Sequence, residues 1–96
     1  MANTKSALKR IRSSERKRQR NRTVRSATRT QIRKAHRLME AREIEEAIEA
    51  TQQAVSLLDR AAEKGVVHRR NAARRKSRLM RALHKAQEET RQQATA

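Results

Sequence analysis

The sequence contains no cysteine, proline, tryptophan, tyrosine or phenylalanine, and its only glycine is Gly65. Without cysteine the chain forms neither a disulfide nor a cysteine-based zinc site, so packing or a partner must hold the fold. Residues that break helices are nearly missing, and the aromatic residues that favour strands are missing altogether. The sequence therefore predicts an all-α protein.

Long apolar runs are missing as well. The start of the chain has no apolar stretch of signal-peptide length, and no segment approaches the roughly 18 to 20 apolar residues that span a bilayer. Cationic helices that lie on membranes carry aromatic or leucine anchors along one face, and this chain has no aromatic residue. We expect a cytoplasmic protein with no membrane partner. An arginine-rich start also occurs in transit peptides, but here the basic character returns near the C-terminus.

Acidic residues are scarce, because 26 lysines and arginines face 10 aspartates and glutamates in 96 residues, giving a formal net charge of +16. One small domain is expected at this length. The charge is +12 over residues 1–34, −4 over 35–63 and +8 over 64–96. Such a chain repels itself in isolation, whereas phosphate backbones neutralise it and release counterions. The predicted partner is nucleic acid.

The middle segment, about 42–63, has the clearest helical period. Its apolar side chains recur at alternating steps of four and three residues, which places them on one face. They are Ile44, Ile48, Thr51, Val55, Leu58 and Ala62, flanked by Ala47, Ala54 and Ala61. Glutamates at 43, 45 and 46 suit the positive end of the helix dipole, and Lys64 followed by Gly65 predicts the end of this helix.

Two basic helices flank it, at about 6–40 and 67–88, and each has an apolar face opposite an arginine-rich face. The first places Val24, Thr28, Gln31, Ala35, Leu38 and Met39 on its apolar face, with Ala27 and Ile32 at the margins, and Arg18, Arg22, Arg25, Arg29 and Arg33 opposite. The other places Ala72, Lys76, Leu79, Leu83 and Ala86 together, widened by Ala73 and Met80, with Arg70, Arg74, Arg78, Arg81 and Lys85 on the reverse side.

The predicted architecture is an antiparallel three-helix bundle at 23–88. A basic arm, residues 1–22, continues into the first helix, and a C-terminal tail follows at 89–96. The connection at 39–42 has no Gly, Pro, Asn or Asp, so one continuous helix is the alternative there.

Residues 9–22 carry eight cations, one acid and one large apolar side chain, so no face of this segment joins a core. Like charges fray such a helix in solution, and phosphates on several sides allow it to form on binding. A solvated tail or localisation signal is the alternative, but two further basic faces favour RNA. With no aromatic residue to stack bases, recognition rests on phosphates, 2′-hydroxyls and shape.

The chain offers no catalytic or metal site in its sequence. His36, His68 and His84 are too far apart to share a helical face as metal ligands, and no nucleophile, phosphate loop or paired acid appears. His68 is better suited to a phosphate or capping contact. We expect a non-enzyme with no metal and no cofactor.

Two other binding functions remain as alternatives. A basic leucine-zipper-like DNA reader fits poorly, because the heptad pattern is short, poor in leucine and followed by a second basic segment. The acidic middle segment could instead hold another protein through Glu45 and Glu49.

Several segments of the sequence together resemble one protein family. Residues 58–68 read Leu-Asp-Arg-Ala-Ala-Glu-Lys-Gly-Val-Val-His, and residues 71–79 read Asn-Ala-Ala-Arg-Arg-Lys-Ser-Arg-Leu. Together with the opening Met-Ala-Asn-Thr-Lys-Ser-Ala and the stretch 21–26, they resemble the bacterial small-subunit (30S) ribosomal protein S20 family over nearly the whole chain. The Asn at 71 stands one position later than in many members, and the glycine often found at the end of the first helix is missing.

The resemblance implies a structural constituent of the small ribosomal subunit: a three-helix bundle that binds small-subunit (16S) ribosomal RNA directly, supports assembly and sends its first helix among RNA helices. It implies a monomer that touches other ribosomal proteins only peripherally. Carried over by position, its RNA contacts are Asn3, Lys5, Ser6, Lys9, Arg10, Arg12, Lys17, Arg18, Asn21, Arg22, Arg25, Lys64, His68, Asn71, Arg74, Arg75, Lys76 and Arg78. The basic faces add Arg29, Arg70 and Arg81. A nonspecific nucleic-acid-packaging protein is the alternative function.

Overall fold

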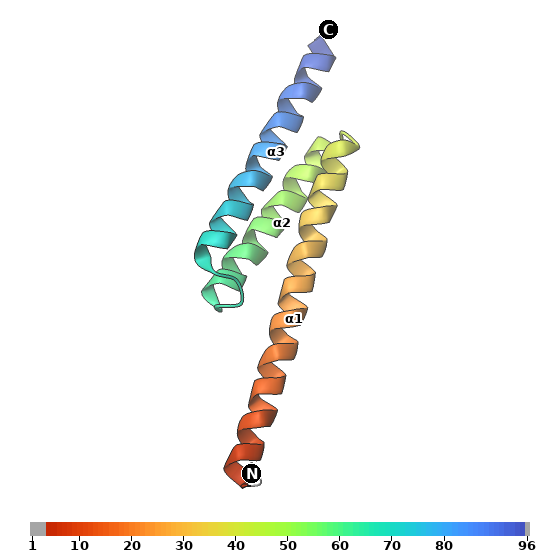
Figure 1. Cartoon of the computed structure of the whole chain (residues 1–96). Helices are drawn as coiled ribbons and strands as arrows, with labels where there is room; N and C mark the ends of the chain where they lie inside the picture. Colours follow the sequence, from red (N-terminus) through yellow and green to blue (C-terminus); the bar gives the residue numbers. More distant parts are fainter. Residues whose placement is uncertain (1–3, 96) are drawn as a thin grey trace.

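The computed structural model describes residues 4–95 and contains three α-helices in that range. They are α1 (Lys5–Glu40), α2 (Ile44–Glu63) and α3 (Arg69–Thr95). The chain runs up α1, down α2 and up α3, so that α2 is antiparallel to both neighbours and lies between them (Figure 1). The all-α, antiparallel three-helix fold is confirmed, and the break between the first two helices replaces the alternative of one continuous helix.

The core lies where α2 packs against α1 on one side and α3 on the other. The buried side chains of α2 are Ala47, Ala50, Thr51, Ala54, Leu58 and Ala61. The isoleucines at 44 and 48, expected at the centre of the buried face, are only half-buried. Because α2 has a neighbour on each side, the alanines that let two helices approach closely take the middle of its packed surface. Its buried face is therefore turned toward the alanine side of the predicted stripe.

The molecule is long rather than compact. It extends 72 × 22 × 16 Å with a radius of gyration of 18.8 Å, whereas a compact chain of this length has about 12.5 Å. The cause is α1, which at 36 residues is about 54 Å long, since a helix rises roughly 1.5 Å per residue. Its N-terminal part continues beyond the turn between α2 and α3, where no other helix of the described chain lies beside it (Figure 1).

The first connection closes without glycine. Arg42 has a φ of 61°, in the left-handed region that side chains other than glycine rarely adopt. Its N–H donates to the Met39 carbonyl (3.1 Å), and the Glu43 N–H donates to the Leu38 carbonyl (3.0 Å). These two hydrogen bonds form a Schellman motif, which normally places glycine at this position. The helix end was hard to locate from sequence because an arginine occupies it.

The second connection uses the same motif with glycine. Gly65 has a φ of +76°, and its N–H donates to the Ala62 carbonyl (3.1 Å) while the Val66 N–H donates to the Ala61 carbonyl (2.9 Å). Val66 is 5% exposed, so the residue after the glycine tucks under the bundle. The end of α2 at residue 63 agrees with the prediction.

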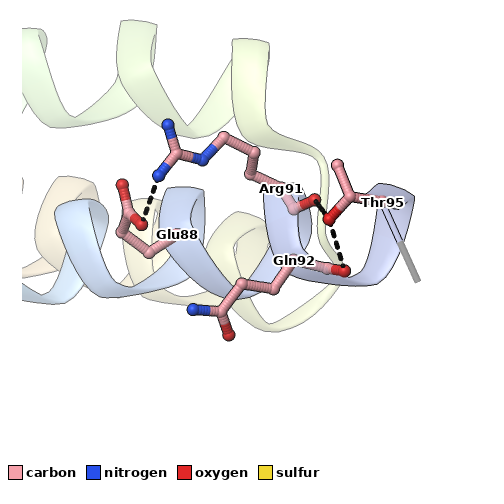
Figure 2. Close-up of polar contacts among 4 residues, drawn as sticks. All are labelled: Glu88, Arg91, Gln92 and Thr95. Atoms are coloured by element: carbon pink, nitrogen blue, oxygen red, sulfur yellow. Dashed lines mark hydrogen bonds and ion pairs between the residues drawn. The ribbon is translucent and has the colours of Figure 1, made fainter.

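The third helix departs from its predicted bounds and face. It continues to Thr95, past residue 88 where we expected it to end. Figure 2 shows contacts within its last turns: Arg91 donates to Glu88 at 2.8 Å, and the Thr95 hydroxyl donates to the carbonyls of Arg91 and Gln92. Residues 87–90 are half-buried and Glu89 pairs with Arg42, whereas residues 91–95 are exposed and are held in the helix by the propensity of glutamine and alanine. Met80, expected to widen the packed face, is instead 56% exposed.

Candidate nucleic-acid interface

The arm presents cations on nearly every side. Thr4 caps α1 by accepting a hydrogen bond from the Ala7 N–H (3.3 Å), and side chains from residue 8 to residue 20 are exposed. At 100° per residue, the nine lysines and arginines from Lys5 to Arg22 are spread around the helix. Among the candidate contacts, Lys5, Ser6, Lys9, Arg10, Arg12, Lys17, Arg18 and Arg22 are exposed on this part of α1, and Asn21 is half-buried. The candidate Asn3 lies outside the described residues.

One row of cations continues from the arm into the bundle. Arg18, Arg22, Arg25, Arg29 and Arg33 follow steps of three and four residues, so they share one face of α1 over more than four turns. We call this row the basic stripe. All five side chains are exposed. The stripe therefore joins a segment without neighbouring helices to a segment that packs on α2.

The turn between α2 and α3 meets the stripe at Arg25. The Arg25 guanidinium donates through Nη2 to the Val66 carbonyl oxygen, at 3.2 Å. Val66 lies 41 residues after Arg25 in the sequence. The contact therefore places the turn, and with it the start of the candidate segment 64–78, where the arm leaves the bundle. Only one of the five guanidinium N–H groups is used in this way, so Arg25 retains donors for a phosphate.

The candidates of the second basic segment differ in surroundings. Lys64 is the C-cap of α2. His68 precedes α3 and accepts a hydrogen bond at Nδ1 from the Arg70 N–H (3.1 Å), so it caps this helix. Its ring then has Nε2 left for another partner. The candidate contacts that are exposed on α3 are Arg70, Asn71, Arg74, Arg75, Arg78 and Arg81.

Lys76 has a partner within the chain. Its Nζ lies 2.7 Å from Asp59 Oδ1 on α2, and its side chain is 32% exposed. This pair links α2 to α3 at an exposed site, where an ion pair contributes little stability. Of the candidate contacts, Lys76 is thus the one whose charge is already matched by a carboxylate within the described chain.

A shallow groove between α1 and α3 gathers further cations. It is lined by Arg29, Ile32, Arg33, His36, Arg75, Arg78 and Leu79, and we call it the α1–α3 groove. The predicted contact set contained Arg29, Arg75 and Arg78 but omitted Arg33 and His36. Their spacing from Arg29, four and seven residues, was the available signal, because it places all three on one face of a helix.

The described surface of residues 4–95 is dominated by cationic side chains. Within residues 4–95, no group of three or more His, Cys, Asp or Glu side chains is placed to hold a metal ion. No helix in the same range is long and apolar enough to cross a membrane. What the surface offers is a large number of guanidinium and ammonium donors, which suit phosphate oxygens.

Comparisons with known proteins agree with the sequence resemblance. The family model for ribosomal protein S20 matches residues 2–84. The small ribosomal subunit protein bS20 of Thermomicrobium roseum is 59% identical over 80 residues, covering 83% of this chain and 81% of that protein. The bS20 proteins of Dehalococcoides mccartyi and Roseiflexus sp. are 50% and 52% identical over 86 residues, covering 90% of this chain and 98% and 93% of those proteins.

Proposed function

Because the chain belongs to the ribosomal protein S20 family, we propose that it is a structural constituent of the small ribosomal subunit and binds the RNA of that subunit. The family is one of structural proteins, so the chain is not an enzyme. The proposed role is to hold RNA segments in place, which requires affinity for RNA and a matching surface shape but no catalysed reaction.

The observation that carries the proposal is the basic stripe on α1. Arg18 and Arg22 stand on the arm, where cations on all sides exclude packing against an apolar protein surface. Arg25 and Arg29 continue the same row onto the bundle, where the 64–78 segment joins it through the Val66 carbonyl. A polyanion that follows this row contacts both parts of the protein at once.

The arm and the bundle bind in different ways. Cations around the whole circumference of the arm neutralise backbones on opposite sides, which suits a helix inserted between RNA helices. The bundle offers a fixed surface from α1, α3 and the turn between α2 and α3. Phosphate contacts of this kind fix position and orientation, and the protein selects its RNA through the arrangement of these fixed points.

We propose further that the chain is a monomer that touches other ribosomal proteins only peripherally, through the outward face of α2. The outward face of α2 carries Glu45, Glu49 and Gln52, all exposed. This acidic face would repel an RNA backbone, so it points away from RNA in the assembled subunit. It is the surface that remains for contacts with other ribosomal proteins.

A salt series on the purified protein tests the proposal. Binding is measured to small-subunit ribosomal RNA, to unrelated RNA of equal length and to duplex DNA. A purely electrostatic binder with about 6 to 10 phosphate contacts loses 10³ to 10⁵ in affinity between about 50 and 200 mM salt on every target. We expect affinity for the ribosomal RNA to survive while the others fall. If all three fall together, the protein is a nonspecific packaging protein instead.

A further inference from the structure

Two adjacent serines interrupt the cations of the arm. Ser13 and Ser14 are exposed, and they are the only hydroxyl-bearing residues in the segment 9–22. Hydroxyls elsewhere on the helices donate to carbonyls of their own helix, as Thr23 does to Gln19 at 3.0 Å. No such bond engages either serine within the described chain. Their hydroxyls are therefore free, on the part of α1 that has no neighbouring helix.

Cations surround this pair of serines on the helix surface. A shallow depression on the arm is lined by both serines together with Arg10, Arg16, Lys17 and Arg20. Arg10 comes three residues before Ser13, and Arg16 and Lys17 come three and four residues after it. Side chains at these spacings are neighbours on a helix. A phosphate group attached to Ser13 would therefore lie within reach of three cations of its own helix.

The residues before Ser13 suit an enzyme that adds such a phosphate. Lys9, Arg10 and Arg12 precede it closely, and no acidic residue occurs before it in the chain. Kinases select their substrates in part by the pattern of charge beside the acceptor hydroxyl. The cations before Ser13 match a serine kinase whose substrate groove is acidic, because opposite charges steer the two surfaces together.

Accessibility separates the arm from a similar charge pattern on α3. Ser77 is also exposed and follows the three cations of residues 74–76. It lies on a packed helix, however, two residues before Leu79, which is 1% exposed. To reach a kinase active site, the serine and its flanking backbone must leave the helix, and this costs little only where few apolar contacts are lost. The arm meets that condition and α3 does not.

We propose that Ser13 and Ser14 form a phosphorylation site for a serine kinase, and that phosphate at this site releases the arm from RNA. The second part rests on the proposed RNA-binding function. The co-reactant is ATP. A bond forms between the serine Oγ and the γ-phosphorus, the bond from that phosphorus to the bridging oxygen of ADP breaks, and the hydroxyl proton passes to a base of the kinase.

The phosphate acts by occupying the cations of the arm. It carries a charge of about −1.5 to −2 at pH 7 and accepts charge-assisted hydrogen bonds from nearby guanidinium and ammonium groups. One phosphate thus matches about two cations, which then no longer neutralise RNA. Because each lost contact lowers the slope of log affinity against log salt by about 0.9, two lost contacts weaken binding roughly 10²-fold at about 0.1 M salt.

The same pairs should make the arm more helical. Like charges four residues apart destabilise the unmodified arm, and a phosphate between Arg10 and Lys17 replaces repulsion by attraction on both sides. Phosphorylation therefore raises the helix content of the free protein while it lowers the affinity for RNA. A modification that merely disrupted the arm would lower both.

The first experiment looks for the phosphate in the protein from its own cells. Sedimentation separates the free chain from the chain bound in ribosomes, and fragmentation of the intact protein in a mass spectrometer locates the modified residue, since trypsin would cut the arginine-rich arm into very short pieces. We expect phosphate on Ser13 or Ser14 in the free pool, little in the ribosomal pool and none on Ser77.

The cellular result can contradict the proposal in two ways. A free pool without phosphate on either arm serine would overturn the site. Phosphate on Ser77 to the same extent would show that the pattern of cations, rather than the unpacked arm, directs the enzyme, and would overturn the assignment to the arm.

The second experiment measures the effect of the phosphate without any kinase. The full chain is produced with phosphoserine incorporated at position 13, and the matched control carries phosphoserine at position 56. Ser56 is exposed on α2, outside the basic stripe, so the control has the same net charge. Affinity for small-subunit ribosomal RNA is measured across a salt series, and helix content is measured by circular dichroism at low salt.

We expect phosphate at position 13 to weaken RNA binding roughly 10²-fold at about 0.1 M salt and to raise helix content, and phosphate at position 56 to change both much less. Equal weakening by the two phosphates would show an effect of net charge alone and overturn the release mechanism, as would unchanged affinity with phosphate at position 13. An unmodified chain that fails to bind the RNA would instead contradict the proposed function itself, so the two failures are distinguishable.

Discussion

Arg25 and Val66 join the base of the arm to the turn between α2 and α3. The donor is Nη2 of the guanidinium and the acceptor is the backbone carbonyl, 3.2 Å away in a partly buried position. This is the only side-chain hydrogen bond between α1 and the turn among the described residues. Arg25 thus links the turn to α1 and also belongs to the basic stripe.

Replacing Arg25 by alanine is expected to lower the free energy of unfolding by about 1 kcal/mol, because a hydrogen bond to a charged donor is lost. Urea unfolding followed by circular dichroism measures the change. Arg22→Ala, one turn earlier with no hydrogen bond of its own in the described structure, is the control and should change stability by less than about 0.5 kcal/mol. Equal effects of both substitutions would show that the Val66 contact adds no stability.

Arg42→Gly should stabilise the turn between α1 and α2. The left-handed φ of 61° costs an L-residue with a side chain about 1 kcal/mol more than glycine. Arg42 also pairs with Glu89 at 2.9 Å, but both side chains are 40% exposed, so that pair contributes little.

Arg42→Ala separates the two effects, since it removes the ion pair and keeps the Cβ atom. We expect Arg42→Gly to exceed Arg42→Ala in free energy of unfolding by about 1 kcal/mol. A glycine variant no more stable than the alanine variant would show that the turn bears no strain at this residue. The same urea titration measures both.

Thr51→Val should also be stabilising. Thr51 is 3% exposed, and its hydroxyl has no hydrogen-bond partner among residues 4–95. A buried unpaired polar group costs about 1 to 3 kcal/mol, and valine has nearly the same shape. We expect a gain of about 1 kcal/mol in thermal or urea unfolding.

Thr28→Val is the matched control for Thr51. Thr28 is 1% exposed, but its hydroxyl donates to the Val24 carbonyl at 2.8 Å. Removing it loses a hydrogen bond, so this substitution should be neutral or destabilising. If both valine substitutions stabilise equally, the gain reflects added apolar volume rather than removal of an unpaired hydroxyl.

Leu58→Ala and Met80→Ala test which large side chains carry the core. Leu58 is completely buried, and its truncation should cost about 2 to 5 kcal/mol. Met80 is 56% exposed, and its truncation should cost less than about 0.5 kcal/mol. If Leu58→Ala proves too unstable to measure, the milder Leu58→Val keeps the comparison. A larger effect at Met80 would contradict the outward position of that residue.

The sequence predicted the fold well because its signals were local. Absent prolines and aromatics favoured helices, and the period of three and four residues correctly placed Thr28, Ala35 and Met39 in the core. The centre of the buried face of α2 and the exposure of Met80 were not predictable in the same way. They depend on how many neighbours a helix has, which periodicity within one helix does not reveal.

Local sequence signals likewise identify only part of the candidate interface, and the rest depends on how the helices pack. Exposed cations on the arm could be named from charge alone, since no apolar face was available there. The pairing of Lys76 with Asp59, and the gathering of Arg33 and His36 with arginines of α3, arise only from packing between helices. Charge in the sequence identifies cations, and tertiary structure determines which of them remain unbalanced.

The helix of the arm should depend on its surroundings. Arg12, Arg16 and Arg20 are spaced four residues apart, and like charges at that spacing destabilise a helix by a few tenths of a kcal/mol per pair, roughly 0.2 to 0.5. Residues 5–20 have no packed face that offsets this repulsion. We therefore expect amide protons there to exchange much faster at low salt than those of residues 28–39, and to slow when RNA is bound.

Hydrogen exchange followed by mass spectrometry measures both segments in one sample. A higher salt concentration without RNA is the control, because screening relieves repulsion but adds no contacts. Salt alone should slow exchange slightly, and RNA should slow it strongly. Protection of the arm as high as that of residues 28–39 before any RNA is added would mean that the arm is a preformed rod, and that binding does not have to order it.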